Sequence, residues 1–436
     1  MKIFDIHSGN RPILKPAKEN TGLLNASDLK FSRLFVSKRA YRPINFILMG
    51  LVLFFWFFGV PATFAAQGTA AMLSRGDGTI LYEKDIDRQL VPASILKIAT
   101  ALAAFHYLGE GFRYETGAGF EKSTGTLYIK GFGDPLFISE QIRPFCRKIA
   151  SKLHEHNIQR IDRIVLDSSY FSDGIAVPGK SDSLNPYDAS IGALCANFNT
   201  VNFKWDSSRQ DYVSAEPQTP LLPFVMEKVR QTGLKNGRIV LDREKSRLYP
   251  GFLIRHFLEE TGMRVDGTIL QGTMPENLSL SITRRSDFTL DAIVRKLLKY
   301  SNNFMANQLL LTIGARESGP PATLEKGVKT VSDYLSGELG LASFKLVEGS
   351  GISRENRISC REMVSIVQEF KPYHRLLRKK GNEYFKTGTL SGIRTRAGFF
   401  RGKDNTLFPY VIMVNRNGEH YYALKRTLAE MVQRLD

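Results

Sequence analysis

The sequence predicts a mixed α/β fold of the α+β kind, in which one domain is interrupted by an insertion with helices and strands of its own. Residues 70–82 contain a hairpin signal, because the turn-forming run Arg75-Gly76-Asp77-Gly78 separates two apolar stretches. Three strand-like runs in 383–415 and a helical pattern over 420–435 lie near the other end. Of the 436 residues, 43% are hydrophobic and 24% charged, a globular balance that excludes a collagen-like, low-complexity or wholly disordered chain.

A basic lead followed by an apolar segment begins the chain. Residues 1–42 carry nine Lys or Arg and three Asp or Glu, and no charged residue occurs in 43–74. The apolar centre of that segment ends in small residues near Ala65 and Ala66, a pattern typical of a cleaved secretory signal peptide. Because the lead is long, a retained membrane anchor is the alternative. We assign residues 1–66 to this leader, and this one long apolar run excludes a polytopic membrane protein.

Both versions of the leader place the chain from about residue 67 onward outside the cytoplasm. We expect a periplasmic protein, associated with the inner membrane through residues 43–66 if the anchor is retained. The formal net charge is +17, and beyond the leader the basic residues are spread out, without a dense block between aromatic residues. Nucleic acid is therefore not an expected partner, whereas an anionic cell wall suits this charge.

The exported part divides into three segments. We expect residues 67–108 to begin the interrupted domain, 109–275 to form the insertion and 276–436 to complete the domain. Pro92 and Ser94 precede an apolar helical pattern, so Ser94 lies at a helix N-terminus and Lys97 lies one turn further on the same face. Further helices are expected over 139–156, 251–262, 286–300, 323–335 and 361–370, and directly after 301–303.

Three short motifs occur in order along the chain. Ser94-Ile95-Leu96-Lys97 is S-x-x-K, Ser301-Asn302-Asn303 is S-x-N, and Lys386-Thr387-Gly388-Thr389 is K-T-G followed by a hydroxyl residue. Each alone is more typical of a helix cap or a turn. Their order and contexts favour a shared site, because Ser94 opens a helix, Ser301 separates two helices and Lys386 begins a strand.

These residue types suit nucleophilic catalysis. A serine hydroxyl needs a nearby base, and Lys97 can be that base if its amine is neutral. Burial beside a second cation, Lys386, would lower the pKa of Lys97. Ser301 can relay the proton to a leaving amine, and Asn303 can orient Lys97 and hold a substrate amide. We therefore predict that Ser94, Lys97 and Ser301 are catalytic.

Together the three motifs resemble those of the serine acyl-transferases that include penicillin-binding proteins and β-lactamases. The resemblance implies an antiparallel sheet flanked by helices. It implies an oxyanion hole built from the backbone N–H groups of Ser94 and Thr389. It also implies that the K-T-G-T segment binds the carboxylate that ends the substrate, through Lys386, Thr387 and Thr389, with Gly388 between them.

The spacing of the motifs indicates the branch of the family. Residues 98–300 separate S-x-x-K from S-x-N, whereas a β-lactamase keeps them much closer. A long insertion resembles the D-alanyl-D-alanine carboxypeptidase/endopeptidases among the low-molecular-mass penicillin-binding proteins. The segments 91–94, 132–135, 166–171 and 348–354 also resemble that group's patterns. The resemblance implies cleavage of the D-Ala-D-Ala bond of peptidoglycan stem peptides, with β-lactam antibiotics as covalent inhibitors.

Two further site residues are implied by the resemblance alone. Asp167, in the L-D-x-S-x-F segment, would reach from the insertion toward the substrate's diamino acid; a strand-end turn carboxylate is the alternative. Arg354, after G-S-G-I-S, would lie near the site, with a surface ion pair as its alternative. The region around 200–250 is short, so the family's smaller third domain is expected to be reduced or missing.

Other chemistries receive little support from the sequence. It has no G-x-S-x-G, H-E-x-x-H or Walker A motif, and its three cysteines, Cys146, Cys195 and Cys360, fit neither a zinc pattern nor a disulfide framework. We expect no metal and no organic cofactor. Two rival functions stay open, a serine β-lactamase and a non-catalytic cell-wall binding protein that keeps a relict site.

Overall fold

A computed structural model describes residues 67–181, 183 and 186–435. The leader, with its proposed cleavage site or anchor, lies outside the described residues. Within the described part, no helix is long and apolar enough to span a membrane.

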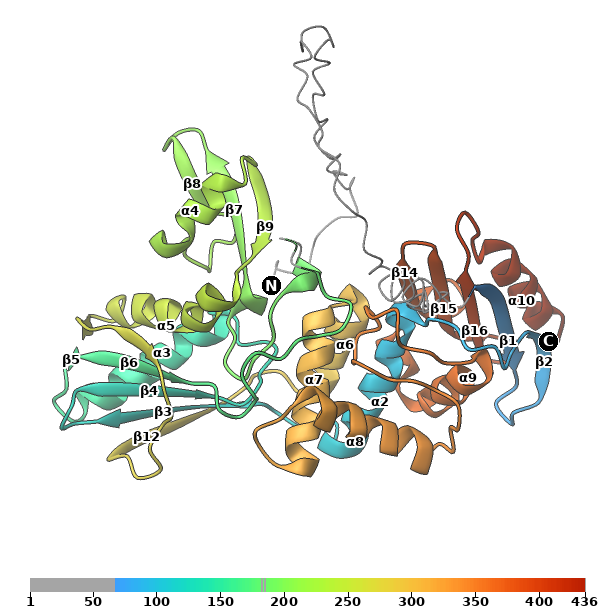
Figure 1. The fold of residues 1–436 in the computed structure, drawn as a ribbon, viewed down its shortest axis with the longest axis horizontal. Coiled ribbons are helices and arrows are strands. Elements are labelled where there is room, and N and C mark those ends of the chain that lie inside the picture. The colour runs from blue at the N-terminus through green and yellow to red at the C-terminus, as the bar shows by residue number, and fades with distance from the viewer. Residues whose placement is uncertain (1–66, 182, 184–185, 436) are drawn as a thin grey trace, which may run out of the picture. The chain divides into compact units, whose positions relative to one another are not determined.

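The two ends of the described chain build one six-stranded antiparallel sheet (Figure 1). Its strand order is β13-β14-β15-β16-β1-β2. The bounds are β1 Gly68–Ser74, β2 Ile80–Lys84, β13 Arg378–Lys380, β14 Glu383–Leu390, β15 Ile393–Arg401 and β16 Leu407–Asn415. The hairpin and the three C-terminal strands expected from the sequence thus meet through the pairing of β1 with β16. This pairing closes the interrupted domain.

Helices cover both faces of this sheet. The C-terminal helix α10 (Tyr422–Leu435) buries Leu428 and Val432 in a core with residues of β1 and β16. On the other face, α9 (Cys360–Glu369) contacts β1, β15 and β16, and α2 (Lys97–Leu108) packs against α7 and α9. The remaining helices of this layer are α6 Leu290–Tyr300, α7 Asn303–Ser318 and α8 Leu324–Gly337, and a short η4 (Lys371–Leu376) precedes β13.

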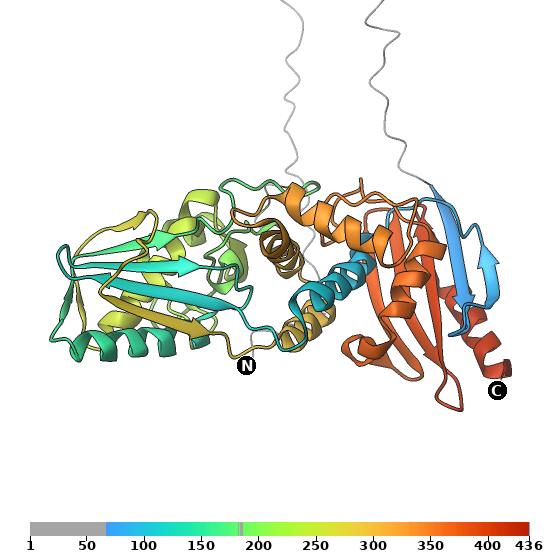
Figure 2. The same ribbon diagram turned by 90° about the horizontal axis from the view of Figure 1, so that it is seen from below.

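The insertion has a five-stranded mixed sheet in the order β11-β6-β4-β3-β12 (Figure 2). β6 pairs in parallel with β4 and β11, while β3 pairs antiparallel with β4 and β12. Helices α3 and α5 share its apolar core. The bounds are β3 Glu115–Glu121, β4 Thr126–Gly131, α3 Ser139–His154, β5 Arg160–Ile161, β6 Arg163–Asp167, α5 Arg243–Glu259, β10 Arg264–Val265, β11 Ile269–Gln271 and β12 Leu280–Arg285. β5 and β10 pair separately, in parallel.

Three boundaries differ from those expected. β12 is hydrogen-bonded to β3, so the insertion's sheet continues past residue 275 to Arg285. Helix α5 begins eight residues earlier than Gly251, at Arg243, because the Asp242 side chain accepts a hydrogen bond from Lys245 N. Helix α6 begins at Leu290 rather than Ser286, because Thr289 is its cap and Ser286 N donates to Tyr114 O.

A third small unit is present within the insertion. Its sheet has the order β8-β7-β9, with β7 Thr200–Asp206, β8 Asp211–Ser214 and β9 Asn236–Val240, and α4 (Pro223–Gln231) lies beside it. The sequence-based alternative that this third unit is missing is therefore wrong for the described chain. The unit follows a short turn, η3 (Asn197–Asn199), and η2 (Pro186–Asp188) lies just before that turn.

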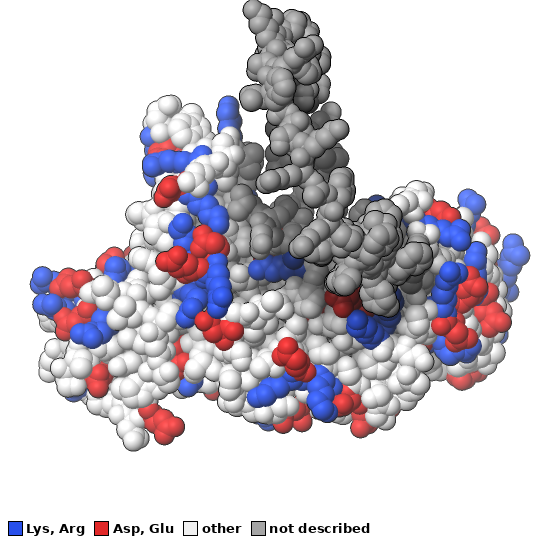
Figure 3. All heavy atoms as spheres, viewed as in Figure 1, with Lys and Arg blue, Asp and Glu red and all other residues white. Residues whose placement is uncertain are grey.

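The surface carries mixed charge. On the face drawn in Figure 3, basic and acidic side chains of the described residues are interspersed rather than gathered into one basic track. Most of the charged pairs are exposed, such as Arg361 with Asp87, and pairs of this kind contribute little to stability.

Candidate active site

The turn that carries Ser94 is held against the six-stranded sheet. Thr395 Oγ1 donates to the carbonyl of Pro92 at 2.7 Å, and Asn415 exchanges two hydrogen bonds with the backbone of Val91. Ala93 has a positive φ of 49°, a conformation that costs a residue with a Cβ and persists only when its surroundings enforce it. A short 3₁₀ turn, η1 (Ala93–Leu96), then leads into α2 at Lys97. Ser94 therefore projects from a strained turn at the start of a helix.

The Lys97 amine is fully buried beside Ser94. Its Nζ lies 3.0 Å from Ser94 Oγ, 2.7 Å from Asn303 Oδ1 and 2.6 Å from the carbonyl of Ser350. Burial lowers the pKa of Lys97 from 10.5 to about 7, although the Glu348 carboxylate acts in the opposite direction. A large fraction of the amine is therefore neutral near pH 7, and a neutral amine at this distance can take the proton of the Ser94 hydroxyl.

Lys386 lies on the other side of the site and contacts Ser301. Its Nζ donates to Ser301 Oγ at 2.8 Å and to the carbonyl of Thr387 at 2.6 Å. Burial holds the pKa of Lys386 well below its usual value, and the positive charge of Lys97 lowers it further. The sequence-based expectation that Lys386 lowers the pKa of Lys97 is not what the structure shows: burial lowers it, and the charge effect between the two lysines acts on Lys386.

Ser301 owes its position to the junction of two helices. It has left-handed backbone angles (φ 54°, ψ 39°) and ends α6. The next residue, Asn302, caps α7 by accepting a hydrogen bond from Met305 N at 3.0 Å. This sharp junction turns Ser301 toward Lys386 and places Asn303 in the first turn of α7, within reach of Lys97.

The K-T-G segment runs along β14 directly beside the nucleophile. A Cβ added to Gly388 would come within 2.8 Å of the Ser94 backbone nitrogen, so glycine permits this close approach. Thr389 is exposed and Thr387 is half-buried, so both are available to a ligand. The backbone N–H of Ser94 and the strand that carries Thr389 are therefore neighbours, which is the arrangement an oxyanion hole requires.

Glu348 is a site-forming residue that we did not single out from the sequence, although the segment 348–354 resembled the family's pattern. Its fully buried carboxylate accepts hydrogen bonds from Ser350 N (2.6 Å), Gly351 N (2.6 Å) and Asn356 Nδ2 (2.8 Å). It also accepts one from Asn307 Nδ2 (3.1 Å) of α7. These bonds fold the segment so that the carbonyl of Ser350 meets Lys97.

The structure does not bring Asp167 to this site. Its carboxylate is fully buried in the insertion, where it accepts hydrogen bonds from Ser169 N (2.8 Å) and Met274 N (2.9 Å) and forms an ion pair with Lys130 (3.3 Å). These contacts hold the pKa of Asp167 below its usual value, against the effect of burial. Asp167 thus has the contacts of the strand-end turn carboxylate that was its alternative reading.

Arg354 is exposed and contacts the end of β14. Its Nη2 donates to the carbonyl of Ser391 at 2.6 Å. This contact joins the segment that begins at Glu348 to the turn that follows K-T-G-T. It differs from the surface ion pair that was the alternative.

The insertion reaches the edge of the catalytic site. A small pocket is lined by Lys180 and Tyr187 of the insertion together with Asn303, Asn307 and Ile352 of the interrupted domain. A larger cavity of about 580 Å³ is lined mainly by residues of the insertion, among them Ser168, Asp173 and Arg247, together with Pro321 of the interrupted domain, and by none of the motif residues. Among the described residues, no group of His, Cys, Asp and Glu side chains could hold a metal ion.

The three cysteines are buried and free. Burial raises the pKa of each thiol far above its usual value, to about 12 for Cys195. None of them is therefore activated as a nucleophile.

Comparisons with known proteins show the family of the chain. The chain matches the family model described as the D-Ala-D-Ala carboxypeptidase 3 (S13) family over residues 62–236 and 229–379. It is 23% identical to a D-alanyl-D-alanine carboxypeptidase of Actinomadura sp. (strain R39), over 85% of this chain and 81% of that protein. It is 21% identical to the D-alanyl-D-alanine carboxypeptidase DacB of Haemophilus influenzae, over 79% of this chain and 84% of that protein.

A solved structure shows the same fold. The crystal structure of penicillin binding protein 4 (dacB) from Haemophilus influenzae superposes with a TM-score of 0.69 and 18% sequence identity. The match covers 85% of this chain and 96% of that one. Fold and family model agree, and the chain belongs to the D-Ala-D-Ala carboxypeptidase 3 (S13) family.

Proposed function

We propose that this protein is an exported serine DD-peptidase that cleaves the D-Ala-D-Ala bond of peptidoglycan stem peptides through an acyl-enzyme on Ser94. The observation that carries the proposal is the buried Lys97 amine, 3.0 Å from Ser94 Oγ and with a pKa lowered to about 7. Burying a charged lysine side chain lowers the stability of the fold, whereas a buried neutral lysine can act as the base that a serine nucleophile needs.

Acylation then follows from the positions of the groups. Ser94 Oγ attacks the carbonyl carbon of the penultimate D-Ala while its proton passes to Lys97 Nζ. The N–H groups of Ser94 and Thr389 stabilise the negative oxygen of the tetrahedral intermediate. As the C–N bond breaks, the proton that Lys97 took from Ser94 passes through the Ser301 hydroxyl, which contacts Lys386, to the leaving amine, so Lys97 is neutral again. The terminal D-Ala departs, and Ser94 is left esterified.

Hydrolysis repeats these roles with water as the nucleophile. Lys97 takes the proton of the water and returns it to Ser94 Oγ when the ester bond breaks. Thr387, Thr389 and Lys386 surround the place where the terminal carboxylate of the substrate binds. The exposed Thr389 and half-buried Thr387 leave that edge of β14 open to a ligand, which supports this assignment.

β-Lactams are proposed as covalent inhibitors of the same serine. Penicillin binding protein 4 of Haemophilus influenzae has been solved in complex with a β-lactam, and that structure matches this chain with a TM-score of 0.64. Attack of Ser94 on the lactam carbonyl would open the ring and leave an acyl-enzyme. Rapid turnover of penicillin, in place of a persistent adduct, would favour the β-lactamase alternative.

The proposed site of action is the periplasm, with peptidoglycan as the partner. The test of the activity is incubation of the purified protein with pentapeptide muropeptides and with cross-linked dimers, followed by chromatography. We expect free D-Ala from the pentapeptide, and cleavage of the dimer would add endopeptidase activity. Binding of both muropeptide substrates without release of D-Ala would favour the non-catalytic alternative. Fractionation of cells, with detection of the chain in membrane and soluble periplasmic fractions, tests the retained anchor.

A further inference from the structure

Phe198 lies in an unusual turn that joins the insertion's small three-stranded sheet to the rest of the molecule. Asn197, Phe198 and Asn199 all have positive φ angles, of 48°, 60° and 52°. Asparagine tolerates this left-handed region, but a bulky phenylalanine does not adopt it without strain. The side chains of all three residues are buried. A strained and buried turn persists only if its surroundings hold it in place.

Hydrogen bonds on both sides hold this turn. Asn197 Oδ1 accepts from Ser139 N at 2.9 Å, and its Nδ2 donates to Ser139 Oγ at 2.9 Å and to Tyr249 OH at 3.3 Å. Asn199 Nδ2 donates to the carbonyl of Ser190 at 2.9 Å. The two asparagines thus fix the flanks of the turn, and the residue between them has no freedom to relax.

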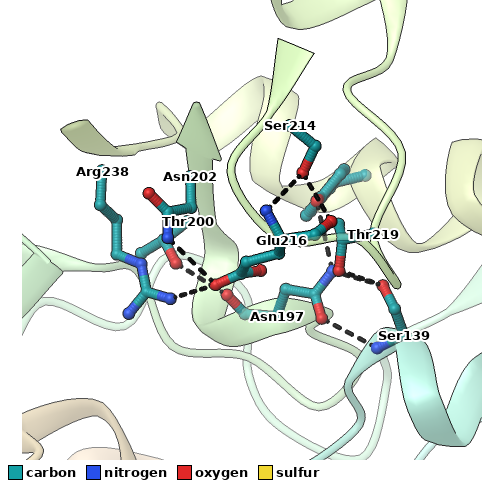
Figure 4. Close-up of polar contacts among 9 residues, drawn as sticks. Ser139, Asn197, Thr200, Asn202, Ser214, Glu216, Thr219 and Arg238 are labelled. Atoms are coloured by element: carbon teal, nitrogen blue, oxygen red, sulfur yellow. Dashed lines mark hydrogen bonds and ion pairs between the residues drawn. The ribbon is translucent and has the colours of Figure 1, made fainter. Parts of the chain in front are cut away.

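Further hydrogen bonds between polar side chains connect this turn to the three-stranded sheet (Figure 4). Glu216 accepts hydrogen bonds from Asn202 of β7 at 3.3 Å and from Arg238 of β9 at 2.6 Å. Thr219 Oγ1 donates to Ser139 Oγ at 2.9 Å, beside Asn197. The three-stranded sheet and α3 therefore support the turn together.

Held in this turn, Phe198 contacts the catalytic domain. The ring of Phe198 meets the ring of Phe304 edge to face, with centroids 5.9 Å apart and an interplanar angle of 85°. Phe304 follows Asn303 directly in the first turn of α7, and Asn303 Oδ1 accepts from Lys97 at 2.7 Å. An aromatic pair in this geometry is favourable beyond the area that it buries.

We propose that Phe198 is a positioning residue for the reaction, which acts through Phe304 to hold Asn303 against the Lys97 amine. The insertion thereby contributes to catalysis without touching the substrate. This inference rests on the proposed function, because it concerns the acylation of Ser94.

The experiment measures the rate constant of acylation by a labelled penicillin for a double-mutant cycle in the full chain. We expect Phe198→Ala to acylate about tenfold more slowly or worse, since a small misplacement of a catalytic group is costly. Adding Phe198→Ala to Asn303→Ala should change the rate no further, because the group that Phe198 positions is already gone. Effects that multiply in the double variant would overturn the proposal.

Two controls separate positioning from loss of structure. Phe198→Gly also lacks the ring but relieves the left-handed backbone, so it should be more stable than Phe198→Ala and equally slow. Phe257→Ala removes a buried ring of α5 from the apolar core of the insertion. It should lower the melting temperature while the folded protein keeps the wild-type acylation rate. If either alanine variant does not fold, the corresponding leucine variants are compared in the same way. An acylation rate of Phe198→Gly equal to the wild-type rate refutes the inference, whereas a wild-type protein that penicillin never labels refutes the proposed function instead.

Discussion

The pH dependence of acylation follows directly from the burial of Lys97. With a pKa of about 7, the amine is half neutral at pH 7 and about 1% neutral at pH 5, whereas at the ordinary value of 10.5 only about 0.03% would be neutral at pH 7. The acylation rate constant should therefore rise tenfold per pH unit up to about 7 and level off above about 8. Labelled penicillin, quenched at intervals between pH 5 and 9, measures this profile.

A matched variant shows whether Lys97 is the titrating group. Lys97→Met keeps the length and apolar character of the side chain, should acylate at least a thousandfold more slowly and should lose the rise near pH 7. A wild-type acylation rate constant that still rises tenfold per pH unit at pH 9, or that does not change down to pH 5, would refute the inference that burial lowers the pKa of Lys97.

The same shift has a consequence for stability. Because the folded protein binds the Lys97 proton more weakly than the unfolded chain does, wild-type stability should rise with pH between about 7 and 10.5. The difference between these two pKa values corresponds to about 5 kcal/mol of unfolding free energy, which is lost below pH 7. Lys97→Met should lack this part of the rise. The lowered pKa of Lys386 acts in the same direction. Its main cause, burial, remains in the variant, whereas the contribution of the Lys97 charge is lost with the lysine.

The remaining predictions concern three other positions. Glu348→Gln places an amide group among N–H donors and should reduce the unfolding free energy by about 3 kcal/mol, as chemical denaturation would show; an unchanged midpoint would contradict the role of this carboxylate. Gly388→Ala should fold but acylate at least tenfold more slowly, because its Cβ would press on Ser94 N; a wild-type acylation rate would count against the close approach of β14. Ser301→Ala should slow the release of D-Ala more than a hundredfold while muropeptide binding persists; D-Ala release at the wild-type rate would exclude the relay.

Much of the catalytic arrangement could be predicted because the chemistry restricts the residue types. Ser94 and Lys97 are one helical turn apart, so their proximity follows from local geometry alone. Ser301 and Lys386 are far from Ser94 in the chain, and the order and contexts of the three motifs, together with their resemblance to a family, predicted a shared site. The structure places Lys97 in contact with Ser94 and Lys386 in contact with Ser301, and the pairing of β1 with β16 and the packing of α2 on α7 join the segments that carry them.

The residues that sequence reasoning missed depend on long-range contacts. The role of Glu348 arises from backbone N–H groups that only the folded segment directs at it, and no spacing pattern reveals them. The resemblance implied a place for Asp167 at the site, with a strand-end turn carboxylate as the alternative. In the structure its carboxylate binds backbone N–H groups and Lys130 within the insertion, contacts that fit the alternative. The assignment of β12 to the insertion follows from its pairing with β3, about 160 residues earlier in the chain. Pairing partners at such separations leave no local signal.

The central claim is that Ser94 is the nucleophile of a D-Ala-D-Ala peptidase. The most direct measurement is mass spectrometry of the intact protein and of its peptides after reaction with penicillin, together with D-Ala release from pentapeptide muropeptides. We expect one adduct, located on Ser94, and D-Ala release that penicillin abolishes, with both lost in Ser94→Ala. An adduct on another residue, or release of D-Ala by Ser94→Ala at the wild-type rate, would contradict the claim.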